Sequence, residues 1–85
     1  MIEERIATPV RTFMARSFEG RVVADDEDIF ALGFGNSLFA MQLVAFIERE
    51  FDVEIDSDDL EMSNFRSIRA ISSLATRKLS TVAQA

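Results

Sequence analysis

The stretch Leu32-Gly33-Phe34-Gly35-Asn36-Ser37-Leu38 marks a point at which a loop ends and a helix begins. Gly33 and Gly35 let the chain turn sharply and leave little bulk beside Ser37. Asn36 is a good N-cap, so Ser37 is expected to be the first helical residue, with an exposed hydroxyl. The unpaired N–H groups and the dipole of a helix N-terminus favour an anion such as a phosphate. The stretch therefore predicts either an ordinary capped helix or a serine that becomes a phosphodiester.

The segment 37–51 after this junction predicts a helix with two apolar faces, where one would suffice for folding. At about 100° per residue, one stripe faces the core and two phenylalanines flank it. The stripe and its flanks are Ala40, Leu43, Val44, Ile47 and Phe51, with Phe39 and Phe46. A second patch of Leu38, Met41 and Ala45 is centred roughly 140° away. Neighbouring helices or a partner protein must cover this patch, and we expect a partner, oriented in part by Glu48.

The stretch 32–38 continues as Phe39-Ala40-Met41-Gln42-Leu43-Val44 and ends as Ile47-Glu48-Arg49-Glu50-Phe51. Over roughly residues 2–79, the chain resembles the acyl carrier protein family. Members of that family carry 4′-phosphopantetheine on the serine of an Asp-Ser-Leu motif, at the start of the second of four helices. The resemblance implies that Ser37 carries this group covalently, with Gly35 and Asn36 beside it. Asn36 stands where the family usually has Asp, which assists the metal-dependent transferase that loads the arm.

The resemblance also implies a function without catalysis. The thiol of the arm holds an acyl group as a thioester, and the protein presents that group to its partners. These partners are a phosphopantetheinyl transferase, an enzyme that loads the acyl group, and polyketide synthase or tailoring enzymes. The run Asn-Ser-Leu-Phe at 36–39 is similar to free-standing carriers of hydroxymalonyl or methoxymalonyl extender units.

Two other interpretations stay open. One is a carrier for an aminoacyl or peptidyl group in non-ribosomal peptide synthesis, which would use the same chemistry at Ser37. The other is an unmodified helical adaptor that binds partners through Leu38 and Met41.

Composition is consistent with a small carrier. The chain has 85 residues, enough for one domain, and 48% of them are apolar, so it can bury a modest core. The net charge of −6 argues against nucleic acid and anionic membrane surfaces as partners. No apolar run approaches the length of a membrane span, and two acids straight after Ile2 are wrong for a signal peptide. We expect a cytoplasmic monomer.

Two residue types are absent altogether. Without cysteine there is no disulfide framework, as suits the cytoplasm. Without histidine there is no Ser-His pair, no imidazole base and no histidine metal ligand. We therefore expect neither a catalytic site nor a metal site, although Gly-Asn-Ser-Leu superficially resembles the Gly-Asp-Ser-Leu motif of some hydrolases.

Upstream of the junction, apolar residues recur at helical spacing and predict a helix from about Glu3 to Ser17. Pro9 lacks an N–H, so this helix is expected to kink near Pro9 or to start afresh there. The loop 19–34 contains four consecutive acids at 25–28, which lack the glycine and spacing of an EF-hand and are expected to be solvated. Ile29, Phe30 and Leu32 are expected to pin this loop to the core.

Downstream of the long helix, the segment 52–56 predicts an extended link, because no second strand is available to pair with it. Ser57 or Asp58 could cap a brief helix through about Met62, an element that in the family helps to shelter or release the cargo. The connector 63–66 is expected to hold one buried anchor, Phe65. Ser67 caps the last helix, whose apolar stripe is Ile68, Ile71, Leu74 and Ala75.

The last helix is expected to end near Leu79. Arg77 and Lys78 would then lie in its last turn and complement the helix dipole. Residues 80–85 are mostly small and predict a frayed tail. The whole chain predicts an all-α fold, a small four-helix bundle of three major helices and one short helix. It forms a single domain over 1–85 with its core at about 2–79.

Overall fold

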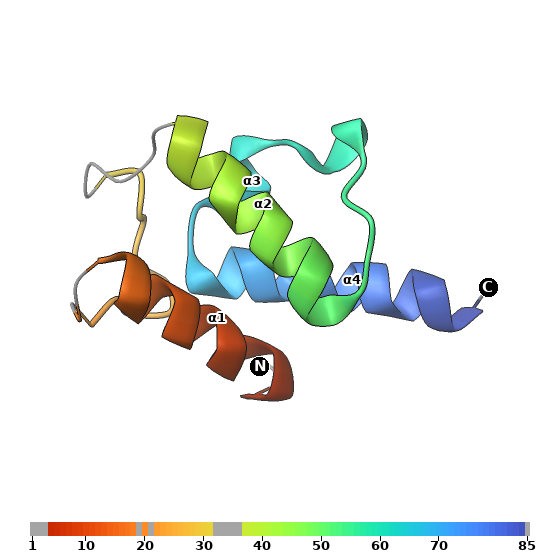
Figure 1. Ribbon diagram of the computed structural model, residues 1–85, viewed down its shortest axis with the longest axis horizontal. Coiled ribbons are helices and arrows are strands. Elements are labelled where there is room, and N and C mark those ends of the chain that lie inside the picture. The colour runs from red at the N-terminus through yellow and green to blue at the C-terminus, as the bar shows by residue number, and fades with distance from the viewer. Residues whose placement is uncertain (1–3, 19, 21, 32–36, 85) are drawn as a thin grey trace.

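A computed structural model describes residues 4–18, 20, 22–31 and 37–84, and the side chains of all of these except 37 and 81–84. Over these ranges the chain is helical and contains no strand (Figure 1). The elements are α1 (Glu4–Ser17), α2 (Ser37–Phe51), the 3-10 turn η1 (Ser57–Asp59), α3 (Met62–Phe65) and α4 (Ile68–Gln84). The predicted bundle of three major helices and one short helix is confirmed.

The helix α1 begins at Glu4 and continues through Pro9 to Ser17. The alternative prediction, a helix that begins at Pro9, is therefore wrong. Pro9 removes one N–H from the helix, but the turn before it contributes Ile6 and Ala7 to the buried face, followed by Val10. Because burial of this continuous face outweighs one lost hydrogen bond, the helix persists across the proline.

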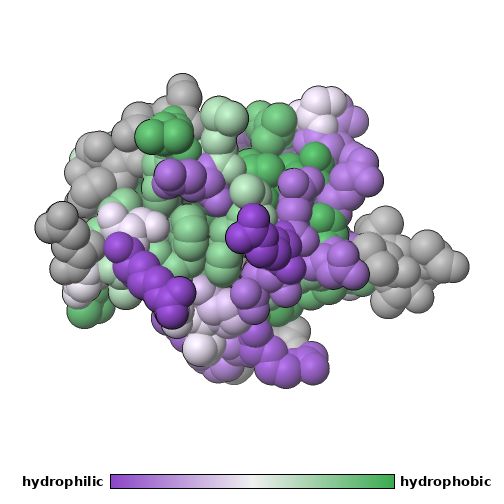
Figure 2. Space-filling view, viewed as in Figure 1, coloured by the Kyte–Doolittle hydropathy of each residue, from purple (hydrophilic) through white to green (hydrophobic). Residues whose placement is uncertain are grey.

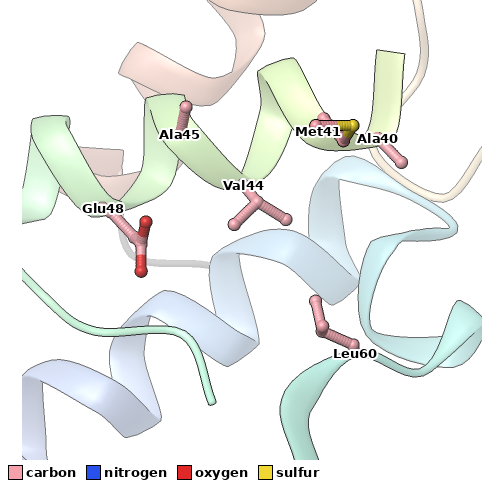
Figure 3. Close-up of a pocket in the computed structure, with 6 residues that line it drawn as sticks. All are labelled: Ala40, Met41, Val44, Ala45, Glu48 and Leu60. Carbon is pink, nitrogen blue, oxygen red and sulfur yellow. The ribbon is translucent and has the colours of Figure 1, made fainter. Parts of the chain in front are cut away.

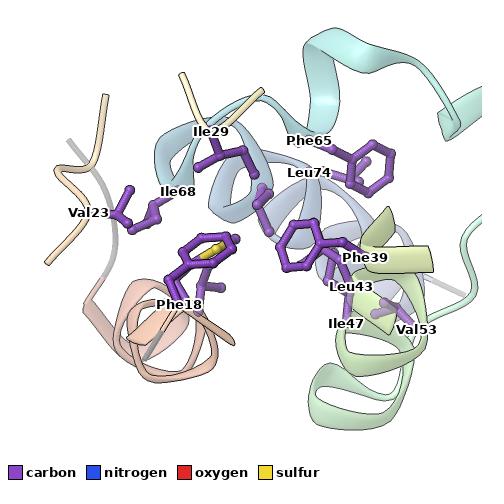
Figure 4. Packing of buried hydrophobic residues seen from close by; sticks show 13 residues of the cluster. Phe18, Val23, Ile29, Phe39, Leu43, Ile47, Val53, Phe65, Ile68 and Leu74 are labelled. Atoms are coloured by element: carbon purple, nitrogen blue, oxygen red, sulfur yellow. The ribbon is translucent and has the colours of Figure 1, made fainter. Parts of the chain in front are cut away.

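The core lies where α1, α2 and α4 meet (Figure 4). The central positions of α2, Leu43 and Ile47, are almost fully buried. The phenylalanines flanking that stripe also belong to the core, as predicted. Phe39 is buried with its ring 5.3 Å from that of Phe18, and Phe46 packs partly buried against the cluster. The predicted anchor Phe65 is likewise buried.

The acidic run at 25–28 was expected to be solvated, but it forms ion pairs with two helices. Asp25 accepts hydrogen bonds from Arg11 of α1 at 2.7 and 2.9 Å, and Asp26 pairs with Arg69 of α4. Backbone hydrogen bonds of 2.9 Å from Ile29 N to Arg66 O and from Arg69 N to Asp25 O join the loop to the start of α4. Ile29 itself is fully buried and Phe30 partly buried, as predicted, whereas Leu32 lies outside the described residues.

Acid is expected to weaken this attachment. The hydrogen bond from Arg11 lowers the pKa of the Asp25 carboxyl from its ordinary value of 3.8. A carboxyl whose pKa is lower in the folded state contributes stability above its unfolded pKa and loses it as the pH falls through the folded value. We expect the pair to stabilise the fold fully at neutral pH and to fail below pH 3.8.

The check is thermal unfolding of the wild type and of Asp25→Asn between neutral pH and pH 2. The variant should have a lower melting temperature than the wild type at neutral pH, and the difference between the two melting temperatures should narrow in acid. Asp52→Asn is the matched control, because Asp52 is exposed and has φ of 54°, which asparagine also adopts. Parallel curves of melting temperature against pH for Asp25→Asn and the wild type would show that the ion pair does not stabilise the fold.

The link 52–56 is extended, as predicted. At its start, Asp52 has a positive φ, and Val53 N donates to Glu48 O at 3.3 Å, which together end α2 in a Schellman-type cap. Further on, Ile55 N donates to the carboxylate of Glu48 at 3.0 Å. The link is thus fixed to the last turns of α2.

The single brief helix predicted through Met62 is wrong: the segment folds as η1 and, after Leu60, as α3. The N-cap of η1 is Asp56, whose N–H donates to the carboxylate of Asp59 at 2.9 Å. Leu60, with φ −82° and ψ 64°, leaves the helical region and ends the turn. Much of the predicted connector 63–66 consequently belongs to α3.

The helix α4 starts as predicted, because Ser67 Oγ accepts a hydrogen bond of 3.1 Å from Ala70 N. Its predicted apolar stripe is buried throughout. The predicted end near Leu79 is wrong, since α4 runs to Gln84 and its last turn contains no basic residue. Residues 80–84 contain neither glycine nor proline to stop the helix, so it continues where a frayed tail was expected.

Candidate functional site

The helix α2 begins at Ser37, as the sequence predicted. Gly35, Asn36 and the side chain of Ser37 lie outside the described residues, so the predicted cap and the exposure of the hydroxyl stay predictions. The first turn of this 15-residue helix contains no acid. A phosphate on Ser37 would therefore meet the positive end of a long helix without a like charge from that turn. These features fit a serine phosphodiester.

The surface that follows Ser37 is apolar and uncovered. Leu38 is 66% exposed and Met41 is 70% exposed, and Ala45 is exposed on the same side of α2. Figure 2 shows apolar surface over the N-terminal end of α2. The structure thus leaves the predicted second patch outside the core and available to another molecule.

A pocket of about 330 Å³ lies beside this patch (Figure 3). It opens between α2 and the segment that joins η1 to α3. Its described lining residues are Ala40, Met41, Val44, Ala45, Glu48 and Leu60. The pocket explains why Ala40 and Val44, assigned from the sequence to the core stripe, are only half-buried. Met41 and Ala45 belong both to the exposed patch and to the pocket wall.

Glu48, which was predicted to contact partners, lies in the pocket wall. Its side chain is half-buried, and Oε2 accepts the hydrogen bond from Ile55 N. The carboxylate therefore joins α2 to the link that follows it. Binding of a partner by Glu48 stays a prediction, and any partner would meet a carboxylate that already has an internal role.

The pocket wall opposite α2 is held by Lys78, a residue expected from its sequence position to complement the dipole of the last helix. Its side chain is 17% exposed, and Nζ donates to Asp56 at 3.1 Å and to Asp59 at 2.7 Å. The hydrogen bond from Lys78 lowers the pKa of the Asp59 carboxyl. Together these contacts fasten η1, and Leu60 directly after it, to α4. No local pattern in the sequence pairs a lysine with acids about 20 positions upstream.

The comparison with known families agrees with this geometry. The model of the family described as "Phosphopantetheine attachment site" matches residues 4–75, which include all of α1 and α2 and the first half of α4. The chain belongs to this family. It is a carrier protein for covalently attached 4′-phosphopantetheine, and it works with a phosphopantetheinyl transferase and with acyl-handling enzymes. No curated protein matches the chain closely enough to count as a relative.

No helix among the described residues is both long and apolar enough to cross a membrane. Within the same ranges, no group of three or more acidic, histidine or cysteine side chains could hold a metal ion. In the acidic run, Asp25 and Asp26 pair with Arg11 of α1 and Arg69 of α4.

Proposed function

We propose that Ser37 Oγ carries the 4′-phosphopantetheine, and that the protein is a non-catalytic carrier of a hydroxymalonyl- or methoxymalonyl-type extender unit in cytoplasmic polyketide biosynthesis. The observation that carries the proposal is the position of Ser37. It is the first residue of α2, within the matched segment, and the helix start has no acid in its first turn. The arm supplies the thiol, which this cysteine-free chain lacks.

The residues of the chain divide the remaining work. Ser37 holds the arm and its cargo on the protein, so that the cargo and the partner enzyme meet at a high local concentration. The exposed patch of Leu38, Met41 and Ala45 begins directly after Ser37 and extends for a little over two turns of α2, where an enzyme acting on the cargo would dock. The pocket beside the patch offers apolar surface to the part of the arm and cargo that carries no charge.

The cargo is tested by isolating the protein from its native host and measuring the mass of the group released from the arm. A malonyl group with an additional hydroxyl or methoxy substituent is the expected result. An amino acid or peptide on the arm would contradict the extender-unit proposal and would favour a carrier of non-ribosomal peptide synthesis.

Asn36 gives a separate prediction about loading. We expect Asn36→Asp to fold and to be loaded by a general transferase at least as fast as the wild type. The new carboxylate would stand at the N-terminus of α2, where negative charge is favoured, and would restore the residue usual in the family. Initial rates of loading, measured by intact mass, provide the check. A clear slowing would mean that Asn36 is adapted to a dedicated transferase.

A further inference from the structure

The pocket beside the exposed patch contains a negative charge in an otherwise apolar wall. Of its described lining residues, Glu48 is the charged one, and the others are two alanines, a methionine, a valine and a leucine. Figure 3 shows the Glu48 carboxylate on the side of α2 from which Val44 also extends toward Leu60. An acyl group that enters the pocket must therefore come close to this carboxylate.

The carboxylate is also held in place. Oε2 of Glu48 accepts a hydrogen bond of 3.0 Å from Ile55 N. The half-buried side chain of Glu48 therefore lies against the link 52–56. A carboxylate has about four lone-pair positions, and this hydrogen bond occupies one of them. Glu48 can therefore accept another hydrogen bond from the pocket side, and leaving the pocket would cost it the bond to Ile55.

The position of the pocket suits a group tethered at Ser37. Val44 follows Ser37 by seven residues in the same helix, which corresponds to about 10 Å along the axis. An extended phosphopantetheine is longer than this, so a tethered acyl group can bend back along α2 into the pocket. Met41 and Ala45 line the route, since they belong to both the patch and the pocket.

We propose that Glu48 determines which cargo the pocket shelters: neutral acyl groups enter, favoured when a hydroxyl can donate to the carboxylate, and acyl groups that end in a carboxylate remain outside. The inference rests on the proposed attachment at Ser37. It implies that a malonyl-type extender unit, once formed, stays in solvent with its carboxylate accessible to the partner enzyme.

The selection follows from the negative charge of Glu48 beside an otherwise apolar surface. A second carboxylate in the pocket would lose its hydration and would stand close to a fixed like charge. A methyl or methylene group has no hydrogen bond to water to lose on entering, and its apolar surface is buried against Val44 and Leu60. A hydroxyl that reaches Glu48 exchanges its hydrogen bond to water for one to a charged acceptor.

The test uses the full chain, loaded by a promiscuous transferase with amide-linked butanoyl, 4-hydroxybutanoyl or succinyl arms. Intact mass first establishes loading. The amide chemical shifts of Val44, Ala45 and Leu60 then report entry into the pocket, relative to protein with the bare arm. Glu48→Gln is the principal variant, because its amide oxygen can still accept from Ile55 N while its NH₂ group can donate to a carboxylate. Glu50→Gln changes the net charge equally at an exposed position of α2.

In the wild type and in Glu50→Gln, the two neutral cargoes should shift these amides and succinyl should leave them unchanged. In Glu48→Gln, succinyl should shift them to an extent comparable with butanoyl. Equal shifts from succinyl and butanoyl in the wild type would overturn the inference, as would continued exclusion of succinyl by Glu48→Gln or shifts from no cargo at all. Failure of the wild type to acquire any arm would instead contradict the proposed attachment, and the inference with it.

Discussion

Replacement of Ser37 by alanine is expected to abolish the phosphopantetheine mass increment completely and to leave the bundle folded. The hydroxyl oxygen is the atom through which the arm would be attached, and alanine offers none. The fold should tolerate the change because α2 is held by burial of Leu43 and Ile47, and alanine has the highest helix propensity.

Intact mass after co-expression with a promiscuous transferase, together with a thermal unfolding curve, measures both effects. Ser57→Ala is a matched control, because Ser57 is an exposed serine at the first residue of η1. Ser57→Ala should gain the arm normally. If Ser37→Ala still acquires the arm, or if it fails to fold, the prediction that Ser37 is the attachment site and is not needed for folding is contradicted.

Met41→Glu is expected to slow transfer of the acyl group to or from a cognate enzyme by roughly tenfold to a hundredfold. Met41 is 70% exposed, so a docked partner could bury most of it, and full burial of such a side chain contributes about 1.5–3 kcal/mol. The first acid after Ser37 in α2 is Glu48, so contacts near Ser37 should depend on apolar burial and persist in salt. Leu38→Glu should behave similarly.

Transfer rates at low and high salt, with all variants carrying the arm, provide the measurement. Met41→Leu is the conservative control and should transfer normally, because it keeps an apolar side chain of similar volume. Glu50→Lys tests charge better than Glu48→Lys, since Glu50 is exposed whereas Glu48 binds Ile55 N. If Glu50→Lys is the most damaging and Met41→Glu is silent, recognition is electrostatic and the patch has another role.

Periodicity alone predicted most of the bundle, because the buried faces of α2 and α4 repeat at helical spacing. Leu43, Ile47, Ile71 and Leu74 were all assigned to the core from their spacing, and all are buried. The start of α2 at Ser37 and the cap at Ser67 were also predictable, since caps depend on residues that are adjacent in sequence.

The features that were predicted wrongly or not predicted at all depend on contacts between residues that are distant in the sequence. Pro9 is tolerated because of what α1 buries around it. Lys78 pairs with Asp56 and Asp59 across the fold, and this arrangement places Leu60 in the pocket wall. A helical wheel of α2 alone marks the apolar patch, but it cannot show that part of that patch faces a pocket.

The measurement that tests the central claim most directly is the intact mass of the wild-type chain after co-expression with a promiscuous phosphopantetheinyl transferase, followed by fragmentation to locate the modified residue. The account predicts one phosphopantetheine increment, carried by Ser37. An unmodified chain would favour the helical adaptor, and an increment on any other residue would contradict the assignment of the start of α2 as the attachment site.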